Sequence, residues 1–95
     1  MNLTTFHNSN KALSAKQLFN GTEGKVVAIH LKKNGKLKEH ITKVPALLVC
    51  VIGEVIYEDE TAIKTILKSG DFFEIKLNVK HWLVAAKDSE AILVK

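Results

Sequence analysis

Short apolar segments separated by turn-forming residues occupy most of the chain from residue 25 onward. The segments are rich in Val, Ile and Leu, and chain reversals are marked by pairs such as Asn34-Gly35 and Gly53-Glu54. Strands are therefore expected over residues 26–32, 37–42, 44–52, 55–58, 62–67, 72–77, 81–87 and 91–95. Short strands that recur at spacings of about eight to twelve residues predict an antiparallel sandwich or barrel.

The first part of the chain has a different pattern. Ser9 or Asn10 is a suitable helix cap, and apolar residues at mixed spacings follow it. We therefore predict a short helix over residues 9–19. This divides the chain into an N-terminal segment with a short helix, residues 1–24, and a β-barrel, residues 25–95.

Residues 46–52, Ala-Leu-Leu-Val-Cys-Val-Ile, are apolar on both alternating sets of positions. A strand with one solvated face would alternate with polar residues, so both faces of this strand should be covered. A chain of 95 residues has little further material to cover the second face. We expect the strand to pack on its copy in a homodimer; the alternative is that residues 1–20 cover it within one chain.

The net charge of +4 comes from 14 basic and 10 acidic residues. Every basic residue is lysine, and the lysines are scattered, with the densest group at residues 32–38 around a turn. Arginine, which makes planar two-pronged contacts with guanine and phosphate, is absent from the sequence. Nucleic-acid binding is therefore not expected.

The chain has no feature of a membrane or secreted protein. Its longest apolar run, residues 46–52, is too short to cross a bilayer as a helix. The first twenty residues lack the basic start and apolar block of a secretory signal. The single cysteine, Cys50, permits no intrachain disulfide and is expected to be a small core residue. We therefore expect a cytoplasmic protein that does not associate with membranes.

A fixed spacing connects five residues near the end of the chain: Gly70, Lys76, Asn78, His81 and Ala85. The spacing resembles the second motif of the small single-domain cupins, in which Gly, Pro, Gly, His and Asn stand at these positions. Asn78 is a reasonable substitute for glycine, because asparagine adopts left-handed backbone conformations at low cost.

The first cupin motif is matched more loosely, with one residue fewer than usual between its first glycine and its first histidine. The matched positions are Gly35, His40, Thr42, Ala46 and Gly53, where the family has Gly, His, His, Glu and Gly. The resemblance covers residues 35–95. It implies an all-β fold, a cupin-type double-stranded β-helix (jelly-roll) barrel, here with a short N-terminal helix.

Metal-binding cupins hold their ion with three histidines and one glutamate, and only His40 and His81 match this set. Two imidazoles alone are a poor site, because zinc and iron sites normally have at least three protein ligands. His30 is a possible third ligand if its side chain points into the barrel. We therefore expect no cofactor, and the alternative is a divalent transition metal bound by these three histidines.

The barrel interior implied by the resemblance is small and mainly apolar, with a polar corner at the two histidines. Its expected lining residues are His40, Thr42, Ala46, Leu48, His81, Leu83 and Ala85. Such a pocket favours a small organic ligand over hydrolytic or redox chemistry, and no catalytic residue is assigned. We expect a protein with a degenerate metal site that binds a small ligand or serves as an accessory domain. The alternatives are a metal-dependent cupin enzyme of the dioxygenase, isomerase or decarboxylase type, and a protein-interaction module.

Overall fold

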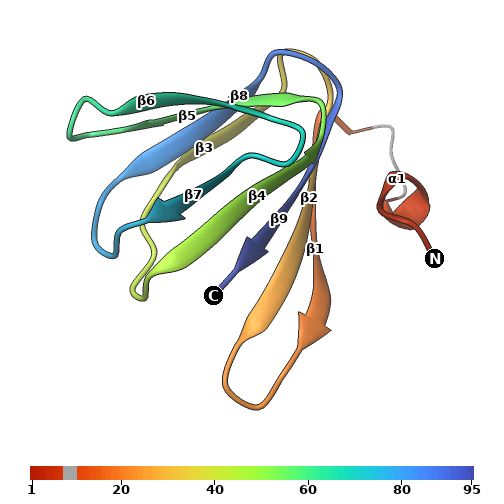
Figure 1. The fold of residues 1–95 in the computed structure, drawn as a ribbon, viewed down its shortest axis with the longest axis horizontal. Helices are drawn as coiled ribbons and strands as arrows, with labels where there is room; N and C mark the ends of the chain where they lie inside the picture. Colours follow the sequence, from red (N-terminus) through yellow and green to blue (C-terminus); the bar gives the residue numbers. More distant parts are fainter. Residues whose placement is uncertain (8–10) are drawn as a thin grey trace.

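Two antiparallel β-sheets face each other in the computed structural model, which describes residues 1–7 and 11–95 (Figure 1). One sheet has five strands in the order β1-β2-β9-β4-β7, and the other has four in the order β3-β8-β5-β6. The strands are β1 Leu13–Asn20, β2 Lys25–Leu31, β3 Lys36–His40, β4 Ala46–Ile52, β5 Glu54–Asp59, β6 Lys64–Lys68, β7 Phe72–Ile75, β8 His81–Ala85 and β9 Ser89–Val94. From β3 onward the chain crosses repeatedly between the sheets, which is the jelly-roll arrangement that the sequence predicted.

The predicted helix over residues 9–19 is wrong. Most of that range forms β1, which is hydrogen-bonded along β2 as an edge of the five-stranded sheet. The register of the pair shifts between Gln17 and Phe19. A strand with such a bulge loses its strict alternation, which is why the mixed apolar spacing resembled neither a regular strand nor a long helix.

The N-terminal helix that the structure does contain is shorter and lies earlier in the chain. It is α1, Leu3–Phe6, and it lies outside the two sheets (Figure 1). The Asn2 side chain caps it by accepting a hydrogen bond of 2.9 Å from the Thr4 backbone N–H. The caps predicted at Ser9 and Asn10 lie outside the described residues. Within residues 1–7 and 11–95, no helix is both long and apolar enough to cross a membrane.

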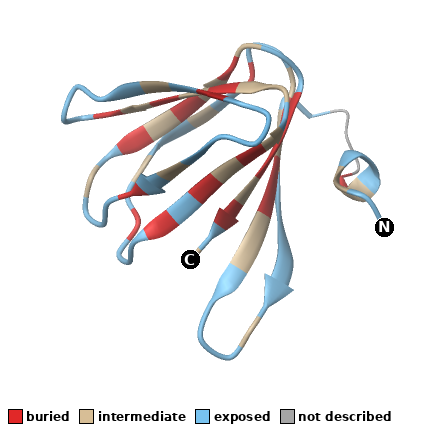
Figure 2. Ribbon diagram, in the orientation of Figure 1, coloured by how far each residue is buried: buried red, intermediate tan, exposed pale blue. Residues whose placement is uncertain are grey.

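The core lies between the sheets and follows the alternation of the inner strands, most clearly β4 (Figure 2), whereas β1 and β3 contribute none of its buried residues. Its buried residues are Ile29, Leu31, Ala46, Leu48, Cys50, Val55, Tyr57, Leu67, Ile75, Leu83, Ala85, Ala91 and Leu93. Cys50 is completely buried, as predicted, and this burial raises the pKa of its thiol. Phe73 packs against the core, whereas the neighbouring Phe72 points to solvent.

Most of the left-handed backbone conformations occur at turn residues suited to them, with Ala62 (φ 68°) as the exception. Asn34, in the Asn-Gly turn, has φ 68°, and Asn78, at the glycine position of the second cupin motif, has φ 60°. Gly53 has φ 94°, and a Cβ built there would lie 2.3 Å from the Ser89 Oγ. These turns set the spacing of the strands that follow them.

Strand ends that carry polar residues meet at one end of the barrel. β3 ends at His40 and β8 begins at His81, which is its partner in the register. β5 ends at Asp59, which is paired with His81 on the other side of β8. Residues 41–45 then carry the chain to the start of β4 at Ala46. We call this the histidine end of the barrel.

Candidate functional site

His40 and His81, which the cupin resemblance selected, lie side by side at the histidine end. The antiparallel pairing of β3 with β8 places them opposite each other, and their ring centroids are 4.2 Å apart. His81 is only 1% exposed, whereas His40 is half-buried. A molecule that approaches the pair from solvent therefore meets the ring of His40 first.

Backbone contacts fix the orientation of both imidazoles. His40 Nδ1 lies 3.1 Å from the carbonyl oxygen of Lys38, and His81 Nδ1 lies 3.2 Å from that of Val79. A carbonyl oxygen only accepts hydrogen bonds, so each Nδ1 is the protonated, donating nitrogen. In the neutral ring, Nε2 then carries the free lone pair. Each histidine can therefore accept a hydrogen bond at Nε2.

The environment keeps His81 neutral. Burial lowers the pKa of His81, and the nearby charges of His40 and Lys95 lower it further. The hydrogen bond to the Val79 carbonyl and the negative charge of Asp59 act in the opposite direction but are smaller than the effect of burial. Near neutral pH the His81 imidazole is thus an uncharged hydrogen-bonding group.

Two residues at this end were missed by the sequence analysis, namely Tyr57 and Asp59. The Tyr57 ring stacks 5.8 Å from the His81 ring and lies 4.5 Å from that of Phe73. Its hydroxyl donates a hydrogen bond of 2.8 Å to Asp59 Oδ2. The signal for both was the alternation in β5, where Val55, Tyr57 and Asp59 share the inward face.

Hydrogen bonds determine the charge state of Asp59. Burial alone raises the pKa of Asp59, but the hydrogen bonds that it accepts from Thr61, Tyr57 and Ile63 lower the pKa more, and the net shift is downward. Burial and, to a smaller extent, the same hydrogen bond raise the pKa of Tyr57. The pair is therefore a carboxylate held by a neutral phenol.

The predicted lining residues fall into two groups. Ala46, Leu48, Leu83 and Ala85 belong to the buried core cluster, where they pack with Tyr57. Thr42 lies at the histidine end with the two histidines. Its backbone is held there by a hydrogen bond of 2.8 Å, which its carbonyl accepts from the Asn78 N–H. Thr42 is 4% exposed, and its buried hydroxyl has no hydrogen-bond partner.

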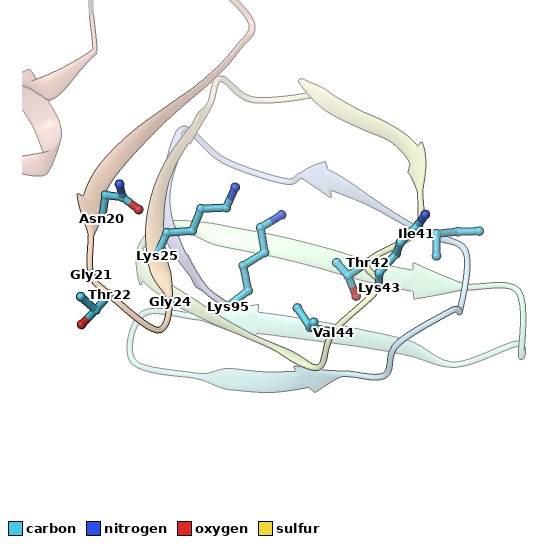
Figure 3. Close-up of a pocket in the computed structure, with 10 residues that line it drawn as sticks. All are labelled: Asn20, Gly21, Thr22, Gly24, Lys25, Ile41, Thr42, Lys43, Val44 and Lys95. Carbon is cyan, nitrogen blue, oxygen red and sulfur yellow. The ribbon is translucent and has the colours of Figure 1, made fainter.

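Two cavities open at the histidine end. The larger, which we call the end cavity, has a volume of about 460 Å³. It is lined by Asn20, Gly21, Thr22, Gly24, Lys25, Ile41, Thr42, Lys43, Val44 and Lys95 (Figure 3). The smaller cavity, of about 170 Å³, is bordered by Tyr57, Asp59 and Phe73 among others. Among the predicted lining residues, only Thr42 borders the end cavity.

His30 lies apart from His40 and His81. Its neighbours Ile29 and Leu31 point into the core, so the His30 side chain points to the outer face of the five-stranded sheet. There its Nδ1 contacts Glu90 Oε2.

The residues present therefore do not fit the metal of metal-binding cupins. Thr42 and Ala46 replace two of the family's four ligands, and the Asp59 oxygens are engaged by Tyr57 and Thr61. In the part of the chain that the structure describes, no three His, Cys, Asp or Glu side chains are grouped to hold a metal ion.

Sequence comparisons find no match to this chain. No family model matches it, and no curated protein is similar to it.

Several solved structures share its fold. One is a cupin superfamily protein from Desulfitobacterium hafniense, with a TM-score of 0.86 and 10% identity over 98% of this chain and 84% of that chain. Another is an RmlC-like cupin from Shewanella frigidimarina, with a TM-score of 0.78 and 22% identity over 87% and 74% of the two chains. A third is a cupin-like protein from Thermotoga maritima, with a TM-score of 0.77 and 26% identity over 87% and 67%. By its fold, the chain is a small cupin-type protein.

Proposed function

We propose that this cupin-type protein binds a small organic ligand, without a metal, at the histidine end of its barrel. The observation that carries the proposal is the end cavity, which is bordered by Thr42 and by Ile41, the residue that follows His40. Ligand pockets in proteins are typically concavities of about 300–1,000 Å³ with a few convergent polar groups. The end cavity lies within this range.

The polar groups at this end are suited to hydrogen bonding. The neutral imidazole of His81 offers a lone pair at Nε2, and the Thr42 hydroxyl can both donate and accept. The barrel centre is filled by side chains such as Tyr57 and Leu83. The ligand is therefore expected at the end of the barrel rather than in its centre.

A fragment screen followed by nuclear magnetic resonance tests the proposal. Neutral and charged fragments are added to uniformly labelled protein, and binding is recorded from the backbone amides and the imidazole carbons. We expect the best fragments to shift the signals of His40, His81 and Thr42 together. His40→Ala and Thr42→Val should weaken binding, whereas Thr5→Val, which makes the same chemical change on α1, should not.

Elemental analysis of protein purified without chelators separates this proposal from the metal-dependent enzyme. Two imidazoles without a third ligand among residues 1–7 and 11–95 favour protein that carries no stoichiometric metal. Stoichiometric Fe, Mn, Zn, Ni or Cu that is lost in His81→Ala would overturn the metal-free proposal. A screen in which no fragment shifts His40 and His81 would overturn ligand binding itself.

A further inference from the structure

Three lysines from separate segments border the end cavity. Lys25 begins β2, Lys43 lies in the connection between β3 and β4, and Lys95 follows β9. Figure 3 shows Lys25 and Lys95 on one side of the cavity and residues 41–44 on the other. No Asp or Glu side chain is among the ten lining residues. The side chains around the cavity are thus neutral or positively charged.

No acidic side chain neutralises these lysines. Among the described residues, the only lysine that forms an ion pair with a carboxylate is Lys80, with Glu39. Lys25, Lys43 and Lys95 have no such partner. The charge of Lys95 reaches the histidine pair, because it contributes to lowering the pKa of His81. Of the three lysines, only Lys95 acts on His81, and its effect is the smallest of those that shift the pKa of His81.

Lys25 and Lys95 are held opposite each other by the sheet. The Lys25 N–H donates to the Lys95 carbonyl at 2.6 Å, and the Lys95 N–H donates to the Lys25 carbonyl at 3.0 Å. Gly24 packs directly on this pair, since a Cβ there would lie 3.0 Å from the Lys95 carbonyl oxygen. Like charges directly opposite on neighbouring strands are destabilising. A bound anion would offset that repulsion.

Thr42 provides a second, independent indication of a ligand. Its hydroxyl is buried without a hydrogen-bond partner, although buried polar groups in proteins are nearly always paired. Its backbone is fixed by the hydrogen bond from Asn78, so the side chain is held at the wall of the cavity. An anionic oxygen can accept a hydrogen bond from the hydroxyl and contact the lysine ammonium groups.

We infer that the end cavity selects small organic molecules that carry an anionic group, a carboxylate or a phosphate. This inference rests on the proposed function, because it names the ligand class of the same binding site. Lys25 and Lys95 hold the anionic group, Lys43 approaches it from the opposite wall, and Thr42 donates a hydrogen bond. The organic part of the ligand lies towards His40.

Benzoate and benzamide provide a matched pair of probes, because they have the same size and differ in charge. We expect benzoate to bind roughly tenfold or more tightly than benzamide in a titration followed by amide shifts at low salt, as charge-assisted hydrogen bonds allow. Added salt should reduce the difference. Inorganic phosphate should compete with benzoate if the anionic group is what the cavity recognises.

Two double variants that remove the same charge test whether Lys25 and Lys95 cause the preference for benzoate over benzamide. Lys25→Gln combined with Lys95→Gln should remove most of the preference for benzoate. Lys68→Gln combined with Lys87→Gln makes the same charge change at exposed positions at the opposite end of the barrel and should leave the preference intact. Thr42→Val should weaken benzoate more than benzamide. The amide spectrum of each variant confirms that it is folded.

The outcomes distinguish this inference from the proposed function. Equal affinity for benzoate and benzamide overturns the inference, as does an equal loss of preference in the two double variants. If either outcome is found but neutral fragments still shift the signals of His40 and His81, the proposed function stands without the preference for anions. If benzoate does not bind at all, the inference is overturned, and the fragment screen alone decides the proposed function.

Discussion

Tyr57 connects the apolar core to the polar end of the barrel. It is 1% exposed, its ring packs against those of both His81 and Phe73, and its hydroxyl donates a hydrogen bond to Asp59. Asp59 also accepts hydrogen bonds from the backbone and hydroxyl of Thr61. One buried phenol therefore orients both an imidazole and a carboxylate.

Removing the Tyr57 hydroxyl should destabilise the fold in a pH-dependent way. Tyr57→Phe keeps the ring but deletes a hydrogen bond to a buried carboxylate, which we expect to cost about 1–2 kcal/mol of unfolding free energy at pH 7. Because the pKa of Asp59 is lowered in the folded protein, its contribution is present above the unfolded pKa and is lost as the pH falls through the folded pKa. The difference between variant and wild type should therefore shrink in acid.

Urea unfolding between pH 7 and pH 3 measures this difference. The control is to introduce Tyr57→Phe into a protein that already carries Asp59→Asn. Because this protein lacks the carboxylate, Tyr57→Phe should have no such pH-dependent effect on its stability. Equal stability of Tyr57→Phe and wild type at pH 7 would contradict the role assigned to the hydroxyl.

At the scale of elements, α1 is attached to the sheet through a buried polar cluster. His7, at the end of α1, lies 2.7 Å from Ser14 Oγ through Nδ1 and 4.0 Å from Glu90 Oε1 through Nε2. His30 contacts the same Glu90 carboxylate from β2. His7 Nε2, His30 Nε2 and Glu90 Oε1 are buried and form no hydrogen bond. The attachment is therefore sensitive to protonation.

The N-terminal segment should detach from the barrel in mild acid. Burial lowers the pKa of His7 from 6.5, although Glu90 opposes this shift; His30 on β2 and Lys16 on β1 lower it further. A histidine with a lowered folded pKa contributes stability above its unfolded pKa and loses it as the pH falls through the folded value. The transition should thus occur below pH 6.5.

Amide hydrogen exchange of residues 3–7 between pH 7.5 and pH 5 measures the attachment, after correction for the intrinsic pH dependence of exchange. Protection should fall in the wild type as the pH decreases. His7→Gln removes the titration while keeping a polar side chain, so its protection should be nearly independent of pH. Wild-type protection that stays constant down to pH 5 would refute the argument.

Local patterns predicted most strands, because their alternation and turn residues are encoded in neighbouring positions. Asn78 illustrates this, since its left-handed conformation follows from its residue type and its position in a motif. β1 could not be predicted in the same way, because it is a strand only through its pairing with β2 and its alternation is interrupted at Gln17. Non-local contacts decided that element.

The candidate site was likewise predictable only in part. The cupin resemblance implied that His40 and His81 meet, and they do. The unpaired hydroxyl of Thr42 and the lysine pair at Lys25 and Lys95 depend on which strand ends come together. No single segment of the sequence contains that information.

At the scale of the whole molecule, part of the outer face of the five-stranded sheet, over β4, β9 and β7, carries apolar side chains that are partly open to solvent. Leu47 on β4 is 36% exposed, its partner Val94 on β9 is 38% exposed, and Phe72 on β7 is 68% exposed. β1 lies at the edge of this sheet, beside β2, so it does not cover β4. Residues of α1 and His7 contact side chains of β1, β2 and β9. The contiguous apolar surface around Leu47 is therefore available for a partner.

We predict that a second copy of the chain covers this face. An isologous dimer buries the same patch on both copies, so each substitution on this face is present twice in the interface. Leu47→Lys places two charges in the interface and should yield monomers at micromolar concentrations at which the wild type sediments as a dimer. Ile66→Lys introduces the same charge at a residue that is 52% exposed on the other sheet, and it should remain dimeric. A monomeric wild type would refute the homodimer, and the open face around Leu47 would then favour the alternative of an interaction module for a different protein.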